Sequence, residues 1–81
     1  MSERLMMEGK LVGLKQEGVA LHHRMEGLCA LIREKLNSSL TPVEEMEIAL
    51  TAAHMDDLVM AQAEILAVNA QIRRINAELG R

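Results

Sequence analysis

Aromatic residues are absent from this 81-residue chain, which has no Phe, Tyr or Trp and only one cysteine and one proline. Without aromatic rings the protein lacks the stacking platforms that bind single-stranded nucleic acids. A single cysteine cannot form an internal disulfide, so nothing indicates an oxidising compartment. The longest apolar run, Leu28 to Ile32, is far shorter than the ~20 residues of a membrane span, and residues 1–10 lack the apolar stretch of a signal peptide. We therefore expect a cytoplasmic protein without a membrane segment.

The charge of the chain is modest and acidic, with a formal net value of −3. Its acidic excess lies in residues 41–81, and no stripe of Lys and Arg runs along the sequence. Nucleic acid is not an expected partner, because affinity for it depends on clustered cations that neutralise phosphates. A hydrophobic fraction of 49% predicts a packed core instead, in a single small domain over residues 1–81.

The only turn-like cluster in the sequence is Asn37 to Pro42. Thr41 as N-cap, Pro42 at the first helical position and Glu44 three residues after the cap match a capping box, which marks the start of a helix. No segment has the alternating pattern of a β-strand, so the fold class is all-α. The predicted elements are a helix over about 2–36, a turn over 37–41 and a helix over about 42–79.

Apolar residues recur at spacings of three and four in both predicted helices, which is typical of a coiled-coil-like seam. In the first helix they are Met7, Leu11, Leu14, Gly18, Leu21, Met25, Leu28, Ile32 and Leu36, and in the second Leu58, Ala61, Ile65, Val68, Ile72, Ile75 and Leu79. A short turn makes the helices antiparallel neighbours, a helical hairpin. The fold-back sets Leu21 opposite Leu58, Leu14 opposite Ile65 and Gly18 opposite Ala61. It also sets Arg33 and Lys35 beside Glu44, Glu45 and Glu47, and Glu3 and Glu8 near Arg73 and Arg74.

Two helices of ~35 residues are each ~50 Å long, whereas a compact 81-residue domain is only ~30 Å across. A lone hairpin buries too little surface to offset the ordering of its residues. We therefore expect a homo-oligomer, a dimer that forms a four-helix bundle. The alternative is a three-helix bundle with a break near Gly13–Gly18, because each glycine inside a helix costs ~1 kcal/mol relative to alanine.

Small residues and one methionine lie on the helix faces away from the seam. Small side chains allow close approach of two backbones, although alanine is also the best helix former on a solvated surface. The candidate interaction residues are Gly13, Ala20, Gly27, Met60, Ala63, Ala67 and Ala70.

Histidines supply the one candidate chemical cluster. In the predicted pairing His22 lies across the hairpin from Asp57, and His54 lies one turn before Asp57 on the same helix. Imidazole and carboxylate groups together can bind zinc or exchange protons. The spacing matches no strong metal motif, so we expect no cofactor and treat the cluster as a weak metal or pH-sensing candidate.

Catalytic motifs are otherwise missing, with no phosphate-binding loop, nucleophile elbow or glycine-rich dinucleotide turn. The sequence therefore predicts a non-enzymatic interaction and oligomerisation module that self-associates and binds another protein. Two alternatives stay open. One is a small chaperone or inhibitor that covers a partner helix, and the other is a metal- or pH-responsive regulator that uses the histidine cluster.

Overall fold

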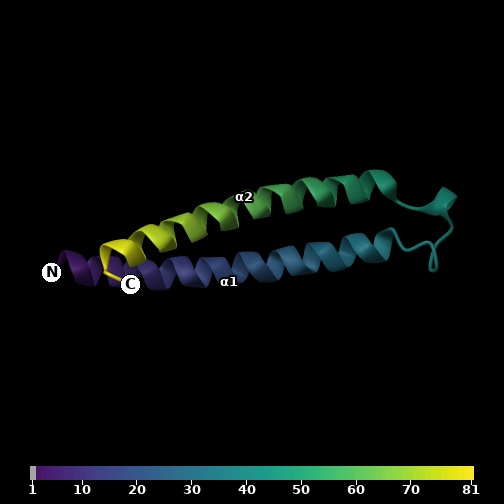
Figure 1. Ribbon diagram of the computed structural model, residues 1–81. Coiled ribbons are helices and arrows are strands. Elements are labelled where there is room, and N and C mark those ends of the chain that lie inside the picture. Colours follow the sequence, from purple (N-terminus) through teal and green to yellow (C-terminus); the bar gives the residue numbers. More distant parts are fainter. Residues whose placement is uncertain (1) are drawn as a thin grey trace.

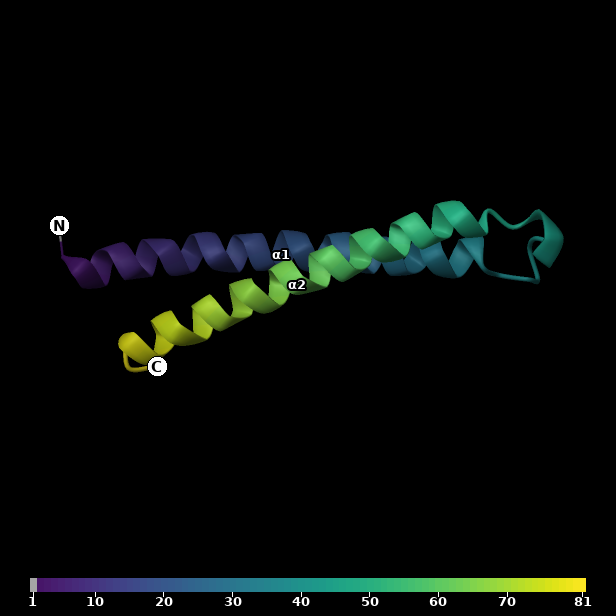
Figure 2. The same ribbon diagram turned by 90° about the horizontal axis from the view of Figure 1, so that it is seen from above.

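The computed structural model describes residues 2–81 as an extended hairpin of two long helices (Figure 1). Helix α1 spans Glu3–Lys35, the short 3-10 helix η1 spans Val43–Glu45, and helix α2 spans Ile48–Glu78. No strand occurs within the described residues. The molecule measures 61 × 19 × 16 Å, and in the view from above α2 crosses α1 obliquely (Figure 2). The predicted all-α class and helical hairpin are confirmed.

Helix α1 is continuous through its glycines. Its N-cap is Ser2, whose side-chain oxygen accepts a hydrogen bond from the Leu5 amide at 3.2 Å. Buried leucines lie on both sides of Gly13 and Gly18 along the helix, so packing against α2 holds this segment in helical form. The alternative of a three-helix bundle with a break near Gly13–Gly18 is therefore wrong.

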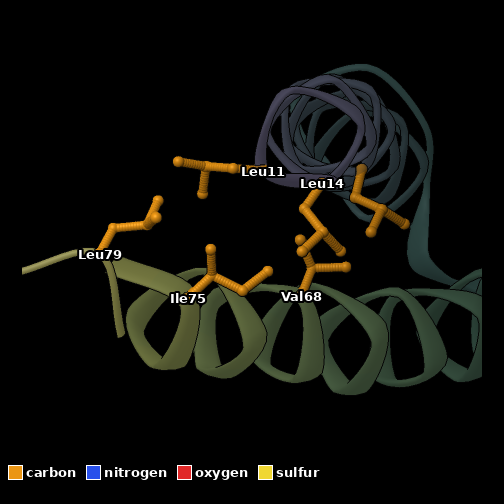
Figure 3. Close-up of a cluster of buried hydrophobic side chains, with 6 residues drawn as sticks. Leu11, Leu14, Val68, Ile75 and Leu79 are labelled. Carbon is orange, nitrogen blue, oxygen red and sulfur yellow. The ribbon is translucent and has the colours of Figure 1, made fainter. Parts of the chain in front are cut away.

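One layer of aliphatic side chains between the helices forms the core (Figure 3). Its buried members are Leu11, Leu14, Leu21, Val68, Ile75 and Leu79, with Ala61 also buried. Met7, Ile65 and Ile72 pack against this cluster while partly exposed. A single layer leaves the opposite face of each helix without a neighbour in the chain.

The connection between the helices differs from the prediction. It runs over residues 36–47, and α2 begins at Ile48 rather than near residue 42. Asn37 organises the turn, because its side-chain oxygen accepts from the Ser39 amide at 2.9 Å and its carbonyl accepts from the amides of Leu40 and Thr41. Pro42, not Thr41, precedes η1, and no side chain caps either η1 or α2. The predicted capping box is therefore wrong.

Acidic residues explain why α2 starts late. Continuing its seam spacing backwards from Thr51 reaches Glu47 and then Glu44. A helix that began at Pro42 would place both carboxylates at apolar seam positions, where burial of an unpaired charge is costly. The chain instead forms η1, and Thr51, which is buried, donates a hydrogen bond from its hydroxyl to the Glu47 carbonyl at 2.8 Å.

The longer connection shifts the pairing of the helices by about two turns. A Cβ atom built at Gly18 lies 3.7 Å from Cγ1 of Val68, so Gly18 faces Val68 rather than Ala61, and the predicted register is wrong. In agreement, the Glu8 carboxylate pairs with Arg81 rather than with Arg73 or Arg74. The predicted proximity of Lys35 and Glu47 is confirmed, with 3.9 Å between the ammonium and a carboxylate oxygen.

Candidate interaction surface

The hairpin has two broad sides that differ in chemistry. A residue one place after a seam residue lies ~100° round the helix on one side, and a residue one place before lies ~100° round on the other. The residues before the seam include many charged ones and form the charged side: Lys10, Glu17, Arg24, Asp57, Glu64 and Glu78. The residues after the seam form the groove side. Helix α2 contributes one charged residue to it, Arg73, and α1 contributes Glu8, Lys15, Glu26 and Arg33.

Shallow hollows follow the groove side where the two helices meet. One of about 260 Å³ is lined by Met25, Cys29, Met55, Leu58, Val59 and Gln62. The next along the hairpin is lined by residues that include Gly18, His22, Ile65, Asn69 and Ile72. Both combine side chains of α1 and α2, so the hollows belong to the hairpin as a whole and follow its seam.

Large hydrophobic side chains are exposed mainly on this groove side. In α1 and its C-cap they are Leu5, Val12, Val19 and Leu36, and in α2 they are Ile48, Met55, Val59 and Leu66. The exposed large hydrophobic residues that the helices place on the charged side are Met6, Leu50 and Met60. The groove side therefore carries most of the large hydrophobic side chains that the two helices leave exposed.

The molecule exposes more surface than a compact protein of its mass. Its accessible area is 5917 Å², against ~4,900 Å² for a folded monomer of this size. Its radius of gyration is 18.2 Å, against ~12 Å for a compact chain of this length. The excess area, on the order of 1,000 Å², is similar to the ~800 Å² that each partner buries in a standard protein interface.

All but one of the predicted interaction residues are exposed in the hairpin. Gly13, Ala20, Gly27, Met60, Ala63 and Ala67 are exposed, and Ala70 is half-buried. A Cβ atom built at Gly13 or Gly27 meets nothing within 4 Å. Most of these residues directly precede a seam residue, so they lie between the charged residues of the charged side.

The structure separates the predicted histidine cluster. Nε2 of His22 lies 3.0 Å from a carboxylate oxygen of Glu26 on its own helix, and His22 lines a hollow with Ile65. The shift in register therefore sets His22 level with Ile65. Ile65 is eight residues beyond Asp57, which is ~12 Å along α2. The predicted position of His22 opposite Asp57 is therefore wrong. Residues 2–81 contain no group of three or more His, Cys, Asp or Glu side chains placed to hold a metal ion.

The groove side was not predicted from the sequence, although a signal for it exists. Leu5, Val12 and Val19 recur every seven residues directly after seam positions, and Val59 and Leu66 do the same in α2. A second apolar line beside the first widens the stripe beyond that of a two-helix seam, as expected for a helix with more than one neighbour.

Comparison with protein-family models, curated proteins and solved structures gave no match to this chain. Within the part of the chain that the structure describes, neither helix combines the length and the apolar character needed to cross a membrane.

Proposed function

We propose that this protein is a non-enzymatic helical module that self-associates as a dimer, forming a four-helix bundle, and binds another protein. The observation that carries the proposal is the set of large hydrophobic side chains left exposed outside the seam, such as Val12, Val59 and Leu66. Burial of each of these side chains against a second helical surface is favourable, by ~25 cal/mol per Å² of apolar surface removed from water. The excess accessible area is enough for one standard interface.

The small residues of the charged side support a separate surface for another protein. Gly13, Ala20 and Gly27 follow one line of α1, and Ala67 follows the matching line of α2 beside Met60. Small side chains let a foreign helix approach closely, and the flanking charges supply specificity for its polar groups.

A small chaperone is the second candidate, and exposed methionines favour it. Met6 and Met60 are more than half exposed, and Met55 is 46% exposed. Methionine is flexible and polarisable, so a surface rich in it adapts to different apolar partners. A chaperone of this kind suppresses the aggregation of an unfolded client at equimolar concentration, which a dedicated dimer module does not.

Multi-angle light scattering tests self-association, since it gives mass independently of shape. We expect a mass near twice 9.0 kDa at micromolar concentration. A particle of 9.0 kDa that melts cooperatively at high temperature would reject the proposal, because the exposed residues would then be stable in water.

Substitution separates the two surfaces within the same assay. Val59→Glu and Met60→Glu change neighbouring side chains of nearly equal exposure, 60% and 64%, that point to the groove side and the charged side respectively. Loss of the dimer in at least one of them is expected if apolar side chains outside the seam hold it together. Retention of the dimer in both would assign the association to other residues.

A further inference from the structure

We infer that a second copy of this chain docks on the groove side with its α1 antiparallel to the first α1 and its connecting loop at the opposite end. This inference rests on the proposed self-association and specifies its surface, its orientation and its register. It follows from the order of charged and apolar residues along α1, whose groove-side positions are complementary to their own reversed sequence.

Two lines of residues on α1 face the groove side, each repeating every seven positions. One line reads Glu8, Lys15, His22, Cys29 and Leu36. The other reads Leu5, Val12, Val19, Glu26 and Arg33. All ten are half-buried or exposed in the hairpin, although the Glu8 carboxylate already pairs with Arg81 and the Glu26 carboxylate with His22 of the same chain. In an antiparallel pair of helices, residues of one line meet residues of the other line from the partner.

One register matches these lines at every pair except the central one, where His22 of each copy meets Val19 of the other. When the residue numbers of facing positions add to 41, Glu8 meets Arg33 of the second copy and Lys15 meets its Glu26. The same register sets Cys29 against Val12 and Leu36 against Leu5. A two-fold axis repeats each pair, as an isologous interface requires. Outside this central pair, opposite charges meet opposite charges and apolar side chains meet apolar ones between Leu5 and Leu36.

The neighbouring registers fail on charge. A shift by seven residues in one direction sets Glu8 against Glu26, and a shift by seven in the other sets Lys15 against Arg33. Like charges in contact oppose association, and surface charges of this kind fix the register of helical pairs.

The other two-fold stacking of the groove sides, with both loops at one end, is disfavoured for the same reason. It packs α1 against α2 of the second copy at equal heights along the hairpin. Lys15 lines a hollow with Ile72 and is therefore level with that end of α2, so the arrangement brings Lys15 to Arg73 of the second copy. It also leaves Glu26 and Arg33 without an opposite charge. In the antiparallel stacking Arg73 lies far from its own symmetry mate.

Charge reversal tests the register directly. We expect Lys15→Glu and Glu26→Lys each to weaken the dimer about tenfold or more, because each creates two like-charge contacts per dimer. The double variant K15E/E26K restores the wild-type dissociation constant. Within one helix the two residues are 11 positions apart, ~16 Å, so they cannot contact each other in one chain. Rescue therefore reports a contact between copies. Lys10→Glu, on the charged side of the same helix, is the matched control and leaves the dimer unchanged.

Cross-linking through the single cysteine gives a second measurement. Val12→Cys should cross-link to Cys29 of the second copy with a short bis-maleimide, and peptide mass spectrometry should identify the 12–29 link. Gly13→Cys should not cross-link, and neither should wild type, whose two Cys29 side chains lie ~25 Å apart along the paired helices.

The outcomes separate the inference from the proposed function. A mass of 9.0 kDa for the wild type overturns both the proposed self-association and this arrangement. A dimer of wild type without the 12–29 cross-link, or without rescue in the double variant, overturns the antiparallel groove-side arrangement and leaves self-association standing. A dimer that shows both supports the arrangement.

Discussion

Replacing Gly18 by alanine is expected to stabilise the protein. Gly18 is the half-buried glycine of the seam, and a Cβ atom at this position lies 3.7 Å from Cγ1 of Val68, an ordinary van der Waals distance. The new methyl group therefore needs no movement of α2. Alanine in a helix interior is favoured over glycine by ~1 kcal/mol, and partial burial of one methyl group adds a few tenths of a kcal/mol.

The expected gain is ~1–1.5 kcal/mol, which corresponds to a rise in melting temperature of roughly 5–10 °C for a domain of this size. Urea unfolding followed by far-ultraviolet circular dichroism measures the gain in free energy of unfolding, since the chain has no Trp or Tyr to report by fluorescence. Protein concentration is kept constant across variants, because the stability of a dimer depends on it.

Two controls separate helix propensity from the contact with α2. Gly13→Ala adds a methyl group that meets nothing within 4 Å, so it reports propensity alone. Gly18→Ala in a Val68→Ala background removes the methyl–methyl contact, and the difference between the two backgrounds measures it. Destabilisation by Gly18→Ala alone would refute the reasoning, because it would mean that the helices approach more closely at Gly18 than described.

Three further outcomes are expected. Leu21→Ala removes a buried seam side chain and lowers the free energy of unfolding by ~2–4 kcal/mol in urea unfolding, and a near-neutral result would place Leu21 outside the core. Thr51→Val keeps the shape but removes the hydroxyl that donates to the Glu47 carbonyl, at a cost of ~1 kcal/mol, whereas no loss would mean that this bond is dispensable. Addition of zinc leaves the melting temperature unchanged, since no cluster of three ligands forms around His22 or His54, and a metal-induced rise that His54→Ala abolishes would contradict the separation of the histidines.

The hairpin itself was predictable because the spacing of apolar residues is local information. The line from Leu11 through Leu14 and Leu21 fixes which face of α1 is buried, whatever the partner. The nearest apolar stripe along the chain that can cover this face is that of α2, so the two helices pair. These parts of the fold need no knowledge of distances between segments.

The register was not predictable from the capping signal alone. Thr41, Pro42 and Glu44 satisfy a local rule for a helix start, yet the decision depends on what Glu44 and Glu47 would face in the assembled seam. That is a long-range effect, and an error in the helix start propagates into every pair across the hairpin. The predicted contact of His22 with Asp57 failed for this reason.

The candidate interaction surface was predictable only in part. The exposure of Gly13, Met60 and Ala67 agrees with their positions outside the seam, because helical periodicity alone places them there. The groove side depends on how both helices combine their flanks, as in the hollow between Cys29 and Met55. Sequence periodicity describes each helix separately, so this shared surface became visible only in the folded hairpin.

The elongated shape of the hairpin affects how the protein behaves in flow. A particle with extents of 61 × 19 × 16 Å experiences more viscous drag than a sphere of equal mass, and it tumbles at different rates about its long and short axes. A single hairpin will therefore elute from a gel-filtration column ahead of globular standards of its own mass. The mass calculated from its elution volume will be too high, so a monomer calibrated against globular standards will resemble a dimer.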